Sequence, residues 1–337
     1  MQQSRLRIVQ AIFTNGFAGS ERITVDLCNE LAERHDVLLV VANDADEHDG
    51  HSILEHVSDK VTVRKISRGF RHFRMAYEVW RFRADVYHAH LGRAVDYAWL
   101  LSSRVRRVAT WHMGRPVKAK WLDGVVLISD WQHSLLPDEN NFAYRVVNNW
   151  VPPVPRASDQ RLAELRNEFN IGPDDFIVGF VGRPSPFKGI HEAVEAFRLW
   201  GKRDVHMIIV GGTVDGVQYQ RRPDDLNIHV TGHRTDVYDF YSLIDCLVAP
   251  SYAEPFGLVA IEAMSAGCRV IVRDSCGLHD IAALNKDVIA LPMSDPELIV
   301  DAMKMAYDLR QVPPQYDMTP YDRDARVADI EAFYRAL

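Results

Sequence analysis

Short apolar segments alternate with longer amphipathic segments along this chain, and the alternation runs twice. The short segments have the length of buried strands, and residues 21–34 show helical spacing through Ile23, Leu27 and Leu31. Strands that alternate with helices predict βαβ units and a mostly parallel sheet. The predicted strands are Leu6–Phe13, Val37–Val41, Val61–Ile66, Val86–His90, Val105–Thr110, Val125–Ile128, Tyr144–Val147, Phe176–Val181, Val205–Val210, Ile228–Thr231, Cys246–Ala249, Arg269–Val272 and Val288–Leu291.

The alternation breaks at "NNWVPPVPRASDQ", where Pro152, Pro153 and Pro155 exclude a regular helix or a central strand. The length of 337 residues also favours two domains. We therefore expect two parallel-sheet α/β domains, residues 1–152 and 153–319, with a cleft between them. Ligands of such sheets bind at the carboxyl ends of the strands, and clefts between domains are common ligand sites.

Charge is distributed unevenly along the chain, whose formal net charge is −7. Residues 60–120 contain fifteen Lys and Arg against three acids, Glu78, Asp85 and Asp96, which gives this segment +12. One interpretation is a set of solvated helix faces. The other is a surface for an anionic partner, such as lipid headgroups, a phosphorylated glycan or nucleic acid.

The apolar runs and the cysteines indicate the compartment. No run approaches the roughly 20 apolar residues of a membrane span, and the N-terminus shows no charged-then-apolar leader. Cys28, Cys246, Cys268 and Cys276 show no CxxC spacing. We therefore expect a cytoplasmic protein without disulfides or structural zinc.

The stretch "GFVGRPSPFKG" places Arg183 and Lys188 after the predicted strand Phe176–Val181 and before a helix. Helix N-termini favour anions, and Arg and Lys are common phosphate ligands. The alternative is a solvated Arg and Lys on a loop. "FTNGFAGSER" similarly brings Gly16 and Gly19 between a strand and a helix. It lacks the GxGxxG and GK[ST] fingerprints, so a plain turn with Ser20 as cap explains it equally well.

The stretch "PSYAEPFGLVAIEAMSAGCRV" places two acids around another strand-to-helix turn. Glu254 lies on the predicted loop and Glu262 on the second turn of the predicted helix, with the open helix N-terminus between them. Carboxylates accept hydrogen bonds from sugar hydroxyls, and the amides bind phosphate. The pattern predicts a site for a phosphate-linked, polyhydroxylated ligand. The alternative is that Glu254 caps the helix or forms an ion pair and that Glu262 occurs by chance.

These motifs together resemble family 4 retaining glycosyltransferases. "SYAEPFGLVAIEAMSAGCRV" resembles their E-P-F-G-L-x-x-x-E-A-M-A-x-G motif, and "VGRPSPFKG" their G-R-(x)4-K-G segment. "GSERITVDLCNELAERHDV" and "DVYHAHLGRA" resemble their Gly-rich loop with its helix and their fourth strand. The resemblance runs through most of the chain. It implies the GT-B fold, with two Rossmann-like domains facing a cleft and a last helix, here 320–337, that crosses back onto the first domain.

The resemblance implies that the C-terminal domain binds a nucleotide sugar, with a UDP-sugar favoured over a GDP-sugar, and the N-terminal domain binds the acceptor. Glu254 would contact the hydroxyls of the donor sugar, and Glu262 would hold the ribose. Arg183 and Lys188 would offset the diphosphate charge in place of a metal ion, so no cofactor is expected.

Further positions carry expected roles. His112, in "VATWHMGRP", matches an acceptor-side His and would orient or polarise the acceptor hydroxyl, unless it is an ordinary loop histidine. His88 and His90 share a strand face, but two ligands do not complete a metal site, and the DxD-like Asp44-Ala45-Asp46 lies in an acidic loop. The remaining expected contacts are the amides of Phe256, Gly257, Leu258 and Val259 to sugar and phosphate, His233 and Arg234 near the base, and Gly19 and Ser20 over the diphosphate.

The leading hypothesis is a metal-independent, retaining hexosyltransferase acting on a glycan or lipid-linked acceptor in cell-envelope or lipopolysaccharide synthesis. Residues 60–120 would contact an anionic membrane peripherally at its inner face, and nucleic acid is not expected. The alternatives are a nucleotide-sugar epimerase or phosphorylase on the same fold, and a catalytically silent GT-B binding subunit.

Overall fold

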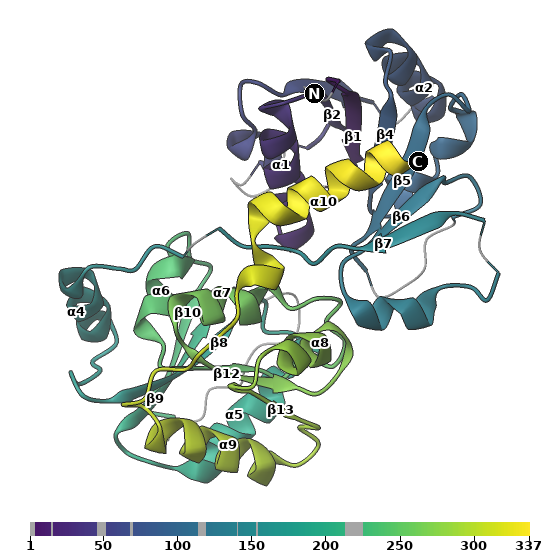
Figure 1. Cartoon of the computed structure of the whole chain (residues 1–337). Coiled ribbons are helices and arrows are strands. Elements are labelled where there is room, and N and C mark those ends of the chain that lie inside the picture. The colour runs from purple at the N-terminus through teal and green to yellow at the C-terminus, as the bar shows by residue number, and fades with distance from the viewer. Residues whose placement is uncertain are drawn as a thin grey trace. The chain divides into compact units, whose positions relative to one another are not determined.

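The computed structural model of the chain (Figure 1) forms two compact units, residues 1–150 with 322–337 and residues 151–321. The structure describes residues 4–14, 16–45, 52–67, 70–113, 119–139, 141–152, 154–212 and 225–337. Each unit is a parallel sheet with helices packed against it, so the predicted α/β fold class is confirmed.

The N-terminal unit contains a seven-stranded parallel sheet in the order β3-β2-β1-β4-β5-β6-β7. Its five inner strands are mostly buried, as expected for parallel strands covered by helices, whereas the edge strands β3 and β7 are mostly exposed or half-buried. The strands are β1 (Arg7–Ile12), β2 (Asp36–Ala42), β3 (Thr62–Ile66), β4 (Val86–His90), β5 (Arg106–Trp111), β6 (Gly124–Leu127) and β7 (Ala143–Val146). The helices are α1 (Gly19–Ala32), α2 (Arg71–Phe82), α3 (Gly92–Val95) and α10 (Arg323–Ala336), with 3-10 turns η1 (Ile53–His56), η2 (Ala98–Leu100) and η3 (Asp130–Leu135).

Helix α10 belongs to the N-terminal unit although it comes last in the sequence. Tyr334 is fully buried in this unit and accepts a hydrogen bond from Gln10 of β1. Glu331 forms an ion pair with Arg34, and its carboxylate lies 3.2 Å from Nε2 of His35, just after the end of α1. Figure 1 shows α10, in yellow, lying beside α1.

The C-terminal unit contains a six-stranded parallel sheet in the order β10-β9-β8-β11-β12-β13. The strands are β8 (Phe176–Val181), β9 (Val205–Val210), β10 (Ile228–Gly232), β11 (Cys246–Ala249), β12 (Arg269–Arg273) and β13 (Val288–Leu291). The helices are α4 (Asp159–Glu168), α5 (Ile190–Trp200), α6 (Val237–Leu243), α7 (Leu258–Ala266), α8 (Cys276–Leu284) and α9 (Pro296–Asp308), with 3-10 turns η4 (Pro186–Lys188) and η5 (Thr319–Tyr321). Adjacent β8 and β11 both end at the edge where the predicted donor-site residues follow.

Candidate functional site

Lys188 and Glu254 form an ion pair at the carboxyl edge of the second sheet. Lys188 ends the turn η4 after β8, and Glu254 lies on the loop after β11. The backbone N–H of Tyr252 donates to the carbonyl of Phe187, which joins the two loops. Gly189 has φ +70°, and a Cβ there would overlap the carbonyl oxygen of Pro250. The glycine of the KG pair therefore lets the Lys188 loop pack directly on the Glu254 loop.

The N-terminus of α7 closely follows Glu254 in the sequence and has no side-chain cap. Its first N–H groups lack intrahelical acceptors, so they and the helix dipole favour an anion. Gly257 precedes the helix with φ +113°, where a Cβ would come within 2.6 Å of Leu278. Phe256 is buried and packs on the ring of Tyr321, while Leu258 and Val259 are partly exposed. The residues whose amides were predicted to bind the ligand, 256–259, thus form one turn, which Phe256 anchors by packing on Tyr321.

Glu262 is buried on α7 and accepts a hydrogen bond of 2.6 Å from the hydroxyl of Tyr241. Tyr241 lies on α6, so this contact also joins two helices. Glu254 is paired with Lys188 instead, so each acid has its own protein partner. Sequence reasoning did not find Tyr241, because nothing local marks a contact across 21 residues.

Arg183 directly follows Gly182 at the end of β8, and its side chain is exposed. Among the described residues it makes no side-chain hydrogen bond or ion pair. Its guanidinium therefore keeps its full donor set for an anion.

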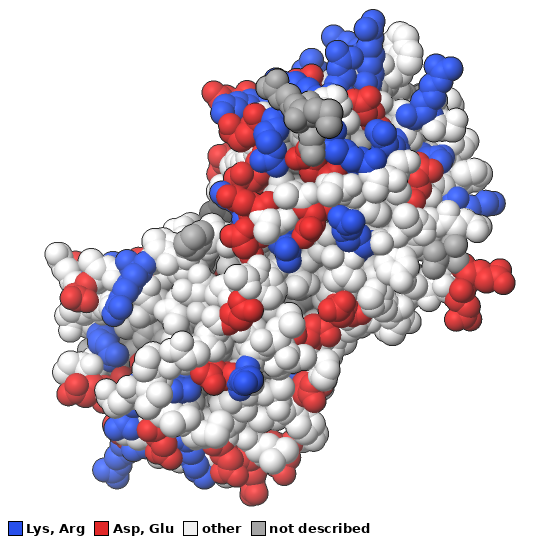
Figure 2. Space-filling model, in the orientation of Figure 1, with Lys and Arg blue, Asp and Glu red and all other residues white. Residues whose placement is uncertain are grey.

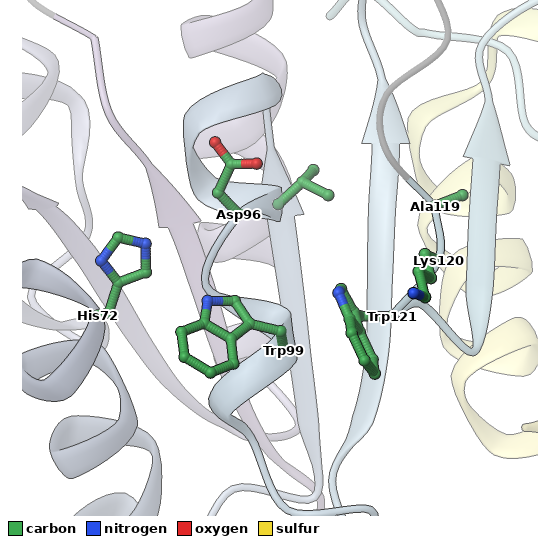
Figure 3. A pocket seen from close by; sticks show the side chains of 7 residues that line it. His72, Asp96, Trp99, Ala119, Lys120 and Trp121 are labelled. Atoms are coloured by element: carbon green, nitrogen blue, oxygen red, sulfur yellow. The ribbon is translucent and has the colours of Figure 1, made fainter.

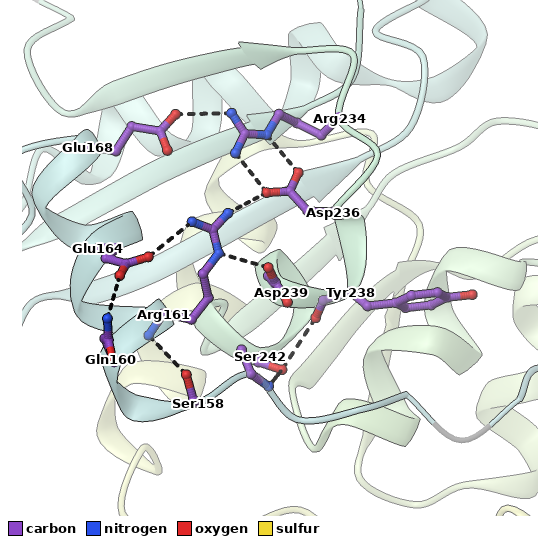
Figure 4. A network of polar contacts seen from close by, with 11 residues as sticks. Ser158, Gln160, Arg161, Glu164, Glu168, Arg234, Asp236, Tyr238, Asp239 and Ser242 are labelled. Atoms are coloured by element: carbon purple, nitrogen blue, oxygen red, sulfur yellow. Dashed lines mark hydrogen bonds and ion pairs between the residues drawn. The ribbon is translucent and has the colours of Figure 1, made fainter. Parts of the chain in front are cut away.

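Arg234 lies instead in a network of ion pairs (Figure 4). It donates to both carboxylate oxygens of Asp236, at 2.8 Å each, and to Glu168 at 3.1 Å. Arg161 of α4 shares Asp236 and also pairs with Asp239. These contacts tie α4 to the loop before α6, so Arg234 has a structural role at the place predicted for the base. His233 beside it is exposed.

Gly19 and Ser20 open α1 in the N-terminal unit. The hydroxyl of Ser20 and the backbone N–H of Ala18 both donate to the carboxylate of Glu21, at 2.9 and 3.1 Å. A carboxylate of the protein thus already accepts hydrogen bonds at this helix start. A diphosphate bound there would share the turn with Glu21.

His112 follows β5 and is buried, with only 7% of its surface exposed. Its Nε2 lies 2.9 Å from Nδ1 of His90, and Nε2 of His90 lies 2.7 Å from Oε1 of Gln10. Burial lowers the pKa of His112 to about 4 and that of His88 to about 3. The histidines are therefore neutral at pH 7, and Gln10 is a partner that the sequence alone did not reveal.

Within the described residues, no group of three or more His, Cys, Asp or Glu is arranged to hold a metal ion. His88 bonds to Tyr334 and Thr110, so both of its ring nitrogens are occupied by protein. Asp46 of the DxD-like stretch lies outside the described residues.

Family models match both halves of the chain. The model for glycosyltransferase family 4 matches residues 17–163, and the model for group 1 glycosyl transferases matches residues 163–321. Together the two models cover residues 17–321, so the chain belongs to the glycosyltransferases that these two models describe. The motifs with Lys188, Glu254 and Glu262 lie within the group 1 match.

Two curated glycosyltransferases show the range of relatives. The chain is 30% identical over 114 residues to the capsular polysaccharide biosynthesis glycosyltransferase CapM of Staphylococcus aureus, covering 32% of this chain and 30% of CapM. It is 28% identical over 162 residues to the lipopolysaccharide 1,2-N-acetylglucosaminetransferase of Salmonella typhimurium, covering 43% of this chain and 42% of that enzyme. The chain thus matches less than half the length of each glycosyltransferase.

The fold resembles the crystal structure of Anabaena Alr3699/HepE in complex with UDP-glucose. The TM-score is 0.78 with 16% identity, over 99% of this chain and 100% of that one. This likeness confirms the GT-B fold of the glycosyltransferase.

Proposed function

We propose that this glycosyltransferase moves a sugar, with retention of configuration, from a nucleoside-diphosphate sugar to a glycan or lipid-linked acceptor. The carrying observation is that Lys188, Glu254 and the uncapped start of α7 all follow β8 and β11 at one sheet edge. Cations and free amides suit a diphosphate, and a carboxylate suits sugar hydroxyls. The capsular and lipopolysaccharide enzymes among the relatives support an acceptor of the cell envelope. The UDP-glucose complex of the similar fold supports a UDP-linked donor.

In the proposed reaction, the bond between the sugar C1 and the diphosphate oxygen breaks, and its electron pair leaves with the diphosphate. The acceptor oxygen forms a bond to C1 on the same face, and its proton passes to a departing phosphate oxygen. Arg183, Lys188 and the α7 amides stabilise the charge that develops on the leaving group. Because these groups supply positive charge, we expect transfer to continue after dialysis against EDTA.

A thermal-shift panel of nucleoside diphosphates tests the donor site. A nucleoside diphosphate at 100 times its Kd stabilises the folded chain by about 2.7 kcal/mol, so UDP should raise the melting temperature. Lys188→Met should remove most of this shift, whereas Lys286→Met, which changes an exposed lysine of α8's following loop, should leave it intact. An equal UDP shift in both variants would contradict the proposed site.

Product analysis with labelled donor then separates the activities. Sugar transferred to an envelope acceptor supports the proposal. Turnover without acceptor indicates an epimerase, and cleavage that depends on inorganic phosphate indicates a phosphorylase. A function in cells that survives Lys188→Ala and Glu254→Ala would indicate a silent binding subunit.

We also propose that the N-terminal unit contacts an anionic membrane through α2. Phe70, Phe73, Tyr77 and Trp80, here called the aromatic stripe, repeat at helical spacing on one face and are 79%, 65%, 54% and 73% exposed. The opposite face buries Met75 and Val79. An exposed apolar stripe on an amphipathic helix is typical of interfacial binding.

The charge around the aromatic stripe suits anionic lipid. Arg74, Arg81 and Arg83 are exposed on α2 and at its end, where Glu78 is the only acid. Figure 2 shows Lys and Arg, in blue, gathered over the part of the unit that carries α2. Each such cation near an anionic surface contributes about 1 kcal/mol. No helix in the described part of the chain is long and apolar enough to cross a bilayer.

A pocket of about 550 Å³ lies beside α2 in the same unit (Figure 3). His72 of α2 and Trp99 line one side, and Trp121 and Lys120 line the other. Both tryptophans are about half exposed, and the Lys120 ammonium lies 5.1 Å from the centre of the Trp121 ring. Tryptophan is a common residue at the headgroup level of membranes.

Flotation with vesicles of phosphatidylglycerol and phosphatidylcholine tests this contact. The chain should float with anionic vesicles, less so at high salt, because screening weakens the cationic part. Trp80→Ala should lower partitioning about tenfold, since burying a large apolar side chain contributes about 1.5–3 kcal/mol. Leu199→Ala, at a 57% exposed apolar residue of α5, is the control. No binding, or binding unchanged at high salt, would contradict the proposal.

A further inference from the structure

A continuous chain of hydrogen bonds runs through the core of the N-terminal unit. None of its six residues is more than 7% exposed. They are Gln10 of β1, His88 and His90 of β4, Thr110 of β5, His112 just after β5, and Tyr334 of α10. Gln10 pairs with His88, and His90 pairs with Thr110, in the sheet register, so the side chains share one face. Buried polar groups of this kind must be satisfied together, because each unpaired one is costly.

The donor and acceptor roles in the hydrogen bonds from Gln10 through His90 to His112 follow from the Gln10 side chain. The Oε1 of Gln10 can only accept, so Nε2 of His90, 2.7 Å away, carries the hydrogen. Burial holds the pKa of His90 well below its ordinary value, so this ring has one proton and its Nδ1 accepts. His112 must then donate from Nε2 across 2.9 Å. The Nδ1 of neutral His112 is left with a lone pair.

The hydrogen bonds from Gln10 through Tyr334 and His88 to Thr110 fix the orientation of the Gln10 amide. Its Nε2 donates to the hydroxyl of Tyr334 at 3.2 Å. That hydroxyl donates to Nδ1 of His88 at 2.6 Å, and Nε2 of His88 donates to Thr110 at 2.7 Å. Every partner in these hydrogen bonds can adopt the role that it is given.

Rotating the Gln10 amide by half a turn would reverse every hydrogen bond in the chain. His112 would then carry its proton on Nδ1, which is buried and has no partner among the described residues. Buried N–H groups without an acceptor are rarer than under-satisfied acceptors. The geometry therefore favours the direction in which Nδ1 keeps a lone pair.

We propose that Gln10, His90 and Tyr334 are positioning residues that hold His112 in the Nε2–H tautomer, with the lone pair on its buried Nδ1. The tautomer itself rests on the contacts within this unit. Through Tyr334, which lies 222 residues after His112, the tautomer also depends on α10.

The tautomer can be read directly in the full chain labelled with ¹⁵N-histidine. Long-range ¹H–¹⁵N spectra at pH 7 distinguish a nitrogen that carries hydrogen from one with a lone pair, and His112→Asn assigns the signals. We expect a protonated Nε2 and a lone pair on Nδ1 in the wild type. A wild-type spectrum with the hydrogen on Nδ1 would overturn the proposal, even if no variant folds.

Two variants test the positioning. Gln10→Leu removes the acceptor of His90, so His112 should shift its proton to Nδ1. Thr110→Val cuts the chain beyond His88 and should leave the His112 signals unchanged. Unchanged His112 signals in Gln10→Leu would overturn the positioning role. Because the spectra need neither donor nor acceptor, failure of the transferase function would appear separately.

Discussion

Gly257→Ala separates backbone strain from packing at the turn before α7. At φ +113° an L-residue is strained by about 1–2 kcal/mol or more. The new Cβ would also lie 2.6 Å from Cδ2 of Leu278 and 3.1 Å from Cδ1 of Ile281. Overpacking of a filled core costs about 1–3 kcal/mol, so we expect a total loss of about 2–5 kcal/mol.

The matched control is Gly201→Ala at the end of α5. Gly201 also has positive φ, +59°, but the nearest atom to its added Cβ is the carbonyl oxygen of Arg198 at 3.6 Å. This variant should lose only about 1 kcal/mol, from strain alone. For a unit of this size, each kcal/mol lowers the melting temperature by about 2–4 °C.

Scanning calorimetry compares the two variants, and UDP titration follows the site. We expect Gly257→Ala to melt about 4–20 °C below the wild type and to bind UDP more weakly, because relief of the clash moves the α7 amides. If Gly257→Ala melts no lower than Gly201→Ala, the assignment of a steric requirement at this turn is wrong.

Three further predictions follow from the site. Glu262→Gln should weaken UDP binding about tenfold, the loss of one charge-assisted hydrogen bond, but leave pyrophosphate binding unchanged in calorimetric titrations; equal losses would exclude a contact to the ribose. In a double-mutant cycle, Lys188→Met and Glu254→Gln should couple by about 1 kcal/mol in unfolding free energy, because the pair is partly exposed, and additive losses would show that the ion pair contributes nothing. Burial lowers the pKa of His88 to about 3 and of His112 to about 4, so between pH 6.5 and 4 the unfolded state binds more protons than the folded state. Urea titrations should therefore show the free energy of unfolding falling by about 2 kcal/mol per histidine from pH 7 to pH 5. Equal stability at the two pH values would contradict buried neutral histidines.

Most strands could be predicted from the sequence because the inner strands are buried on both faces and read as apolar runs. Every predicted strand is present, with ends that differ by at most one residue, as for Leu6–Phe13 against Arg7–Ile12. The first helix was predicted over 21–34 and runs over Gly19–Ala32. Its start is set by the contact of Glu21 with the Ala18 amide, which periodicity does not encode.

The candidate site was predictable where its residues belong to one motif and not where a partner comes from elsewhere in the chain. Lys188 and Glu254 stand in recognisable segments, but their ion pair depends on β8 and β11 being neighbours. The partner of His88, Tyr334, is 246 residues away and no local signal marks it. The aromatic stripe was readable at positions 70, 73, 77 and 80, but only the charge of that segment was interpreted.

Helix α10 has a consequence for biosynthesis. The first sheet leaves the ribosome early, yet its core needs Tyr334 and its α1 end needs Glu331, which are translated only after the whole second unit. Until then Gln10 and His88 lack the Tyr334 hydroxyl that each of them contacts in the folded unit. In a nascent chain stalled before residue 323, the first unit should therefore be compact but not stably packed, and sensitive to proteases.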